Sequence, residues 1–302
     1  MADAKQRYAV VTGSNKGIGF ETVKGLASNG IKVVLTARDE KKGYEAVQKL
    51  RESGLSDLVV FHKLDVTDPA TIASLVEFVK VQFGRLDILV NNAGINAFNM
   101  DDVVESATIN WRELSETYDM AEKCLKTNYY GAKETTEAFL PLLHLSNSPY
   151  IVNVSSQAGQ LKVSSQNQLV LRRVVQQYIP SEWAKRVLED SENITEERIE
   201  KVVKEFMKDF KEDSLKEKEW PTFLSAYTIS KAALNSYTRF LAKKHENISI
   251  NCVCPGFVKT DMTKNTGTLP VEDGAASVVR LALLPNGSSS GNFFARQEVT
   301  DF

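Results

Sequence analysis

Short runs rich in valine and isoleucine alternate along this chain with segments of helical periodicity. The runs span residues 8–12, 32–36, 58–62, 86–91, 150–154 and 249–253. Polar residues rarely interrupt them, which is typical of strands that are buried on both faces of a parallel sheet. Parallel neighbours need a crossover connection, usually a helix, and such crossovers are right-handed. One such helix is expected after Asp68, a plausible N-cap, with Pro69 as its first residue. The alternation therefore predicts an α/β fold with a doubly wound parallel sheet, the Rossmann architecture.

Residues 160–221 break this alternation, because they are charged and helix-forming and contain no strand candidate. Thr195 can cap a helix, and an apolar stripe at spacings of three and four follows it: Ile199, Val202, Val203, Phe206 and Phe210. We expect a single domain, residues 1–302, with a helical insertion at residues 160–221. The stripe either packs on its own domain or serves as an arm for a partner protein. Residues 163–177 have weak periodicity and support no prediction.

Composition excludes several classes of protein. The 302 residues include 37 Lys and Arg against 39 Asp and Glu, a net charge of -2 that argues against nucleic-acid binding. No apolar run approaches the ~18 residues that span a bilayer, so we expect no membrane segment. Three cysteines give no disulfide framework. The first residues lack the apolar core of a secretory signal, and we therefore expect a cytoplasmic protein.

A glycine-rich loop with the sequence TGSNKGIG occupies residues 12–19, after the first predicted strand and at the start of the first predicted helix. Glycines let the backbone approach a pyrophosphate, and a helix N-terminus favours an anion. The loop predicts a dinucleotide site, with a purely structural turn as the alternative. Its candidate cofactor residues are Gly13, Asn15, Lys16, Gly17, Ile18 and Gly19.

The end of the second predicted strand indicates which dinucleotide is bound. An acidic residue there would bind the ribose hydroxyls of NAD, but the strand ends in Ala37 and Arg38. Arg38 suits a 2′-phosphate, and Lys16 can add a second positive charge. Asp39 is a competing acid that can instead cap the next helix. We therefore expect NADP(H) rather than NAD(H).

Tyr227 and Lys231 are four residues apart in a segment of helical periodicity, so their side chains share one face. A phenol has an ordinary pKa of about 10 and is a poor acid or base near neutrality. A neighbouring ammonium favours the phenolate and lowers that pKa. The pair predicts proton transfer at a site close to the dinucleotide.

Six motifs in order give the chain a specific resemblance. They are TGSNKGIG at 12–19, NNAG at 91–94, KTNY at 126–129, IVNVSS at 151–156, YTISK at 227–231 and PGFVKT at 255–260. The chain resembles the short-chain dehydrogenase/reductase family. Its long segment before Tyr227 is similar to that of carbonyl reductases and plant salutaridine or menthone reductases.

The resemblance implies four catalytic roles. Tyr227 would donate a proton to the carbonyl oxygen, and Ser156 would hydrogen-bond the same oxygen. Lys231 would hold the nicotinamide ribose and lower the pKa of the tyrosine. Asn128 would kink its helix and support a water that leads to Lys231.

The resemblance also implies further contacts to the dinucleotide. They are Asp65 and Val66 at the adenine, Asn92, Ala93 and Gly94 at the ribose, and Pro255, Gly256, Val258 and Thr260, with Tyr227 and Lys231, around the nicotinamide and phosphates.

The expected function is NADPH-dependent reduction of a ketone on a bulky apolar small molecule of terpenoid or alkaloid type. Alternatives are reduction of a conjugated C=C bond and a non-catalytic NADP(H)-binding regulator. A hydrophobic pocket could be lined by Trp183, Phe206, Trp220 and Phe223 of the insertion and by Phe98 and Met100 of the 95–111 loop, or these residues could belong to the core. Ser156 and Tyr227 are 71 positions apart, so the insertion must return for the two side chains to meet. In relatives with such an insertion it covers the face that others use to dimerise, which implies a monomer.

Overall fold

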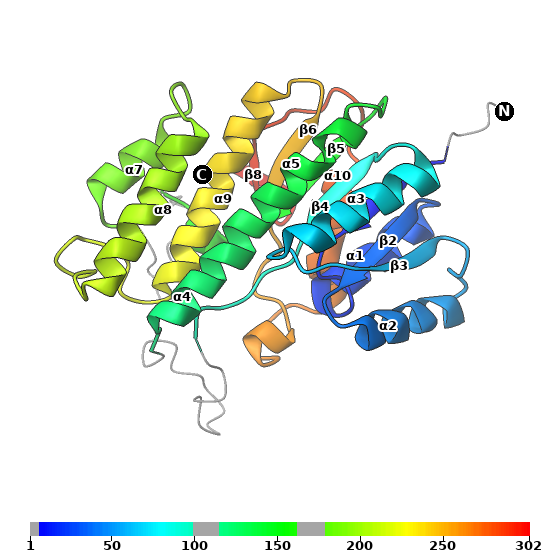
Figure 1. Ribbon diagram of the computed structural model, residues 1–302, viewed down its shortest axis with the longest axis horizontal. Coiled ribbons are helices and arrows are strands. Elements are labelled where there is room, and N and C mark those ends of the chain that lie inside the picture. The colour runs from blue at the N-terminus through cyan, green and yellow to red at the C-terminus, as the bar shows by residue number, and fades with distance from the viewer. Residues whose placement is uncertain (1–5, 99–114, 162–178) are drawn as a thin grey trace.

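Eight strands of the described residues form one sheet in the order β3-β2-β1-β4-β5-β6-β7-β8 (Figure 1). The computed structural model describes residues 6–98, 115–161 and 179–302. The strands are β1 Tyr8–Val11, β2 Lys32–Ala37, β3 Val59–Lys63, β4 Ile88–Asn91, β5 Tyr150–Val154, β6 Ser249–Cys254, β7 Phe293–Ala295 and β8 Glu298–Thr300. Only β8 is antiparallel to its neighbour. The predicted doubly wound parallel sheet is confirmed.

The six apolar runs all contain a strand, with boundaries that shift by up to two residues. The largest shift is in β4, which begins at Ile88 rather than at residue 86. Sequence reasoning missed β7 and β8 entirely. Each has three residues, which is too short for a periodicity to be recognised. They extend the sheet beyond β6 at its C-terminal edge.

Helices cover both faces of the sheet, and the alternation of β1 shows how. Ala9 and Val11 lie in the core under α1, α2 and α10, whereas Val10 lies in the core under α3, α5 and α9. Because successive side chains of a strand point to opposite faces, one short apolar run contributes to both cores. The bounds of these helices are α1 Gly17–Ser28, α2 Glu40–Glu52, α3 Pro69–Phe83, α5 Gly131–Leu143, α9 Ser225–Lys244 and α10 Val271–Ala282.

The predicted caps begin their helices. Asp68 accepts a hydrogen bond from the Ala70 N–H at 3.0 Å at the start of α3, and Pro69 is the first helical residue. Thr195 accepts from the Arg198 N–H at 3.3 Å. These caps satisfy N–H groups that a helix start leaves without an intrahelical partner.

Two α-helices of the described residues lie between residue 178 and α9: α7, Glu182–Glu189, and α8, Glu196–Lys211. We call them the helical flap. The α8 residues Ile199, Val202, Val203 and Phe206 are buried in the core that includes α9, and Phe210 packs at its margin. Helix α9 of the same chain thus covers the apolar stripe. Residues 162–178, with the segment 163–177, lie outside the described residues, so the insertion over residues 160–221 as a whole stays a prediction.

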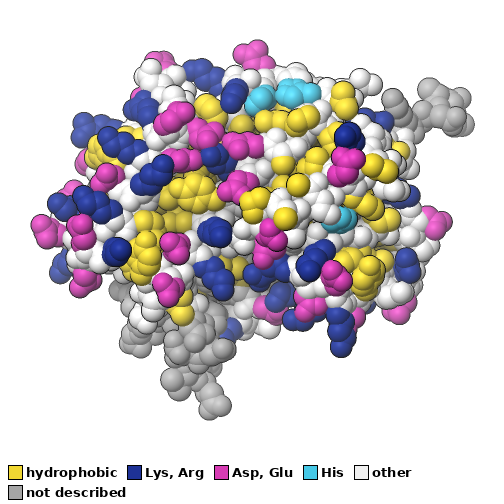
Figure 2. All heavy atoms as spheres, viewed as in Figure 1, with side chains coloured by type: hydrophobic (Ala, Val, Ile, Leu, Met, Phe, Trp, Pro, Cys, Tyr) yellow, Lys and Arg dark blue, Asp and Glu magenta, His cyan; other side chains and the backbone are white. Residues whose placement is uncertain are grey.

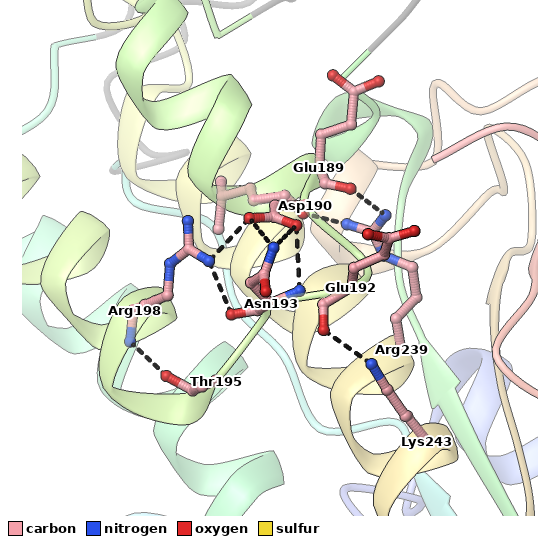
Figure 3. A network of polar contacts seen from close by, with 9 residues as sticks. Glu189, Asp190, Glu192, Asn193, Thr195, Arg198, Arg239 and Lys243 are labelled. Carbon is pink, nitrogen blue, oxygen red and sulfur yellow. Dashed lines mark hydrogen bonds and ion pairs between the residues drawn. The ribbon is translucent and has the colours of Figure 1, made fainter.

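Polar contacts fasten the turn between α7 and α8 to the C-terminal half of α9 (Figure 3). Arg239 of α9 donates to the Leu188 and Glu189 carbonyls, and Lys243 donates to the Glu192 carbonyl at 2.8 Å. Within the flap, Arg198 forms an ion pair with Asp190 at 2.8 Å. Because side-chain cations of α9 bind backbone carbonyls at the end of α7, the flap has a defined position on that helix.

The face of the molecule drawn in Figure 2 mixes both signs of charge. Figure 2 shows Lys and Arg side chains next to Asp and Glu side chains across the whole view, over the flap as well as over α3 and α5. Among the described residues, no helix is both long and apolar enough to cross a membrane.

The flap's contact with α9 predicts a large cost for truncating Phe206, whose side chain is 0% exposed. Phe206→Ala should lower the free energy of unfolding by about 3–5 kcal/mol, because it removes buried surface and leaves a cavity. Urea denaturation measures this. Lys208→Ala, at an exposed position on the same helix, is the control, with an expected change within about 0.5 kcal/mol. Equal costs for the two variants would contradict the packing described.

Candidate active site

The strand order changes direction between β1 and β4, and ligands of open α/β sheets bind at such a point. Hydrogen bonds join the loops that follow these two strands. The Thr12 hydroxyl accepts from the N–H groups of Asn92 and Ala93, each at 2.9 Å. The Asn92 amide donates to the carbonyls of Thr12 and Gly13 at 2.9 and 3.0 Å. These hydrogen bonds fix the two loops relative to each other at the point where a ligand is expected.

The glycine loop fits a dinucleotide phosphate. Gly13 and Gly17 have φ values of +59° and +58°, which disfavour residues with a side chain. A Cβ at Gly19 would lie 2.4 Å from Asn92 Nδ2. In the described structure Lys16 makes no side-chain cap for α1. The first N–H groups of that helix thus remain available for an anion.

The loop after β6 lies opposite the glycine loop. Thr260 faces Gly17, where an added Cβ would lie 3.7 Å from Thr260 Cγ2. Lys16 Nζ lies 2.5 Å from Asp261 Oδ2, and both side chains are about two-thirds exposed. The expected second charge for a 2′-phosphate is therefore paired with a carboxylate here. Other predicted residues of this loop follow β6 directly: Pro255, Gly256 and Val258.

Arg38 follows β2 and is exposed, and within the described part of the chain it has no ion-pair partner. Asp39 caps α2 by accepting from the Lys42 N–H at 3.0 Å. The competing acid therefore has a structural role. Asp65 accepts from the N–H and hydroxyl of Thr67 at 2.9 and 2.8 Å. Next to it Val66 is buried, and Asn15 and Ile18 are partly exposed in the glycine loop.

Tyr227 and Ser156 meet despite their separation in sequence. Ser156 follows β5, and Tyr227 lies near the start of α9. Their side chains lie close enough for the Ser156 hydroxyl to affect the pKa of the Tyr227 phenol. The Ser156 oxygen also accepts from the Ala158 N–H at 3.1 Å, which leaves its proton for another acceptor. Burial raises the pKa of the Tyr227 phenol above its ordinary value, and the Ser156 hydroxyl offsets part of this shift.

Lys231 lies beside this pair and is 5% exposed. Its Nζ donates to the Val154 carbonyl at 2.9 Å and is 5.7 Å from the centre of the Tyr227 ring. Burial lowers the pKa of Lys231 to about 8. Lys231 was expected to lower the pKa of the phenol, but in this structure that pKa is raised, with burial as the largest cause. The ammonium donates to a backbone carbonyl instead.

Asn128 lies in a π-helical turn, η3 Lys126–Tyr130, between α4 Tyr118–Leu125 and α5. The expected distortion of its helix is therefore present. Its amide accepts from the Ile95 N–H at 2.8 Å and donates to the Ile95 carbonyl at 3.0 Å. It also donates to Ser230 of α9 at 3.1 Å. A Cβ at Gly94 would lie 3.3 Å from Asn128 Oδ1 and 3.6 Å from Lys231 Nζ. Predicted residues of the NNAG, KTNY and YTISK motifs (Gly94, Asn128 and Lys231) thus lie next to one another.

A family model described as short chain dehydrogenase matches residues 7–168 and 214–269, more than half of the chain. The chain belongs to the short-chain dehydrogenase/reductase family. The predicted family and enzyme class are confirmed. The model passes over residues 169–213, which lie within the predicted insertion.

Individual members of the family are similar over almost the full length. The chain is 55% identical over 311 residues to (+)-neomenthol dehydrogenase of Arabidopsis thaliana, covering 100% of both chains. The solved structure of salutaridine reductase from Papaver somniferum is 49% identical, with a TM-score of 0.85, and the match covers 96% of this chain and 99% of that one. Carbonyl reductase [NADPH] 3 of Mus musculus is 37% identical, covering 92% of this chain and 91% of its own.

Sequence reasoning missed Glu116, which caps the helix that carries Tyr227 in this short-chain dehydrogenase/reductase. Leu224, which precedes α9, has a φ of 46° and makes no side-chain cap. Glu116 Oε2 instead accepts from the N–H groups of Ser225 and Ala226 at 3.0 and 3.4 Å. Burial raises the pKa of Glu116. No local pattern could reveal a cap 109 residues away from Ser225.

The lowered pKa of Lys231 predicts a pH dependence of stability. The folded chain loses this proton near pH 8, whereas an unfolded lysine keeps it to about pH 10.5. Between these values the unfolded state binds more protons. The free energy of unfolding, relative to Lys231→Met, should therefore rise with pH by up to about 1.4 kcal/mol per unit. Urea denaturation of both proteins from pH 7 to pH 10 measures it. A difference that does not change with pH would contradict the burial of this ammonium.

Proposed function

We propose that this short-chain dehydrogenase/reductase uses NADPH to reduce a ketone on a bulky apolar small molecule, of terpenoid or alkaloid type, to a secondary alcohol. The meeting of Tyr227 and Ser156 beside the buried Lys231 carries this proposal. The names of the plant relatives support the substrate class, since neomenthol is a terpenoid alcohol and salutaridine an alkaloid. The mouse relative's name supports NADPH as the reductant.

In the proposed mechanism, two hydroxyls bind the oxygen of the ketone. Ser156 donates a hydrogen bond to that oxygen, keeps its own proton, and stabilises the charge that develops on the oxygen. Tyr227 donates the proton that completes the alcohol, and burial raises the pKa of its phenol further above neutral pH. NADPH, when bound, supplies the hydride. Lys231 would hold the nicotinamide ribose of the bound cofactor, and the π-helical turn at Asn128 would support a water that leads back to Lys231.

The cofactor preference rests on the end of β2. Arg38 is exposed there and can bind a 2′-phosphate, while Asp39 is occupied as a helix cap. The remaining contacts are proposed for the residues of the glycine loop, of the loops after β3, β4 and β6, and of α9: Gly13, Asn15, Lys16, Gly17, Ile18, Gly19, Asp65, Val66, Asn92, Ala93, Gly94, Pro255, Gly256, Val258, Thr260, Tyr227 and Lys231.

We propose that the enzyme is a monomer, because α8 packs over α4 and α9.

Phe206 and Trp220 are 0% and 3% exposed, with ring centres 5.5 Å apart, so they belong to the core of the flap. Trp183 is more exposed and packs edge-on against Trp220. Met100, also considered for the pocket, lies outside the described residues. The cytoplasmic location stays a prediction.

Removing the Tyr227 hydroxyl tests the mechanism. Tyr227→Phe should lower kcat for ketone reduction by about 10²–10⁴-fold, because the proton donor is lost. The affinity for NADPH should change little. NADPH absorbance with a panel of terpenoid and alkaloid ketones measures the rate. The control is Tyr237→Phe on the same helix, whose hydroxyl contacts Glu137 at 3.3 Å and not Ser156. Near-normal turnover of Tyr227→Phe would exclude the assigned role.

Reversing the charge at Arg38 tests the cofactor. Arg38→Asp should lower the ratio of kcat/KM for NADPH to that for NADH by about tenfold or more, because it replaces a phosphate partner with an acceptor for ribose hydroxyls. Arg51→Asp, at an exposed position at the other end of α2, is the control for the change in net charge. If both variants keep the ratio of the wild type, Arg38 does not select NADP(H).

A further inference from the structure

We propose that Asn235 is a positioning residue that sets Ser156 against Tyr227. The proposal rests on the proposed function, because it concerns the same pair of hydroxyls. Asn235 lies on α9, four residues after Lys231 and eight after Tyr227. Residues at this spacing lie on one face of a helix. Asn235 therefore extends the row of side chains that points from α9 toward the end of β5.

Asn235 contacts the backbone segment of Ser156 on both sides of that residue. Its Oδ1 accepts from the Ser155 hydroxyl at 2.5 Å, and its Nδ2 donates to the Gly159 carbonyl at 3.1 Å. The side chain is 2% exposed. The acceptor and the donor of one buried amide thus bind the residue immediately before Ser156 and the residue three positions after it.

The turn that contains Ser156 also lies directly against the backbone of α9. A Cβ at Gly159 would lie 2.5 Å from the carbonyl carbon of Lys231 and 2.6 Å from the nitrogen of Ala232. The turn closes on itself, because the Gly159 N–H donates to the Ser156 carbonyl at 3.0 Å. This close approach leaves room for glycine alone. The Asn235 contacts therefore act on a turn that cannot move toward the helix.

Asparagine suits this place because the turn presents one donor and one acceptor. The Ser155 hydroxyl needs an acceptor, and the Gly159 carbonyl needs a donor. An aspartate would set a carboxylate oxygen against the Gly159 carbonyl, and an alanine would leave both groups without a partner. Helix α9 carries the Tyr227 phenol as well as this amide. Their separation within one helix thus sets the distance between the two hydroxyls that would bind the ketone oxygen.

A double-mutant cycle on the full-length enzyme distinguishes positioning from general stability. Asn235→Ala should lower kcat by about tenfold or more, while KM for NADPH stays within about twofold. In a Ser156→Ala background the same substitution should lower kcat by less than about twofold, because the hydroxyl that it positions is gone. Single-turnover NADPH oxidation at high enzyme concentration measures the slow variants.

Ser236→Ala is the matched control. Ser236 is a buried neighbour on α9 whose hydroxyl donates to the Leu188 carbonyl at 3.0 Å, on the side of the flap. This variant should lose stability with kcat unchanged. An Asn235→Ala enzyme with normal kcat would overturn the proposal. An equal loss of kcat with and without Ser156 would also overturn it, because that result indicates a purely structural role.

Ser155→Ala tests the same contact from the strand side if Asn235→Ala does not fold. It removes only the Ser155 hydroxyl and should lower kcat by about threefold or more, again only when Ser156 is present. A normal kcat for Ser155→Ala would then overturn the proposal. The Ser156→Ala enzyme separates the two ideas. If Ser156→Ala keeps full activity, the proposed function fails. If Ser156→Ala loses activity but Asn235→Ala and Ser155→Ala keep normal kcat, only the role of Asn235 fails and the proposed function stands.

Discussion

The packing of α9 against the end of β5 brings the candidate active site together. One face of this helix carries Tyr227, Lys231 and Asn235, and each of them contacts the end of β5 or the turn after it. The contact is close because Gly159 lies against the helix backbone. Since Ser156 and Tyr227 are 71 residues apart, only tertiary packing can bring their side chains together.

The same helix is held from its other side and at its start. The flap buries Phe206 against it, Arg239 donates to carbonyls at the end of α7, and Glu116 caps its first turn. Packing from both sides buries Lys231 and partly buries Tyr227, which disfavours their charged forms. The pKa of the phenol is therefore raised and that of the ammonium lowered. For a reductase, a neutral phenol is the form that donates a proton.

Local patterns predicted those parts of the molecule that depend on neighbours in sequence. Apolar runs gave six strands, Asp68 gave a helix start, and the spacing of Tyr227 and Lys231 gave a shared helix face. Contacts between distant residues could not be predicted in this way. The pairing of Lys16 with Asp261 is an example. The expected lowering of the Tyr227 pKa was also wrong, because a sequence shows which charges are near a group but not how deeply that group is buried.

The destination of the hydride tests the central claim most directly. NADPH deuterated at its reactive nicotinamide carbon would be incubated with the enzyme and with cyclic terpenoid and alkaloid ketones, and the products examined by NMR. Two hydroxyls on the ketone oxygen predict an alcohol with deuterium on its carbinol carbon. A product that keeps its carbonyl and carries deuterium at a former C=C bond would contradict the account, as would an absence of transfer to every ketone tested.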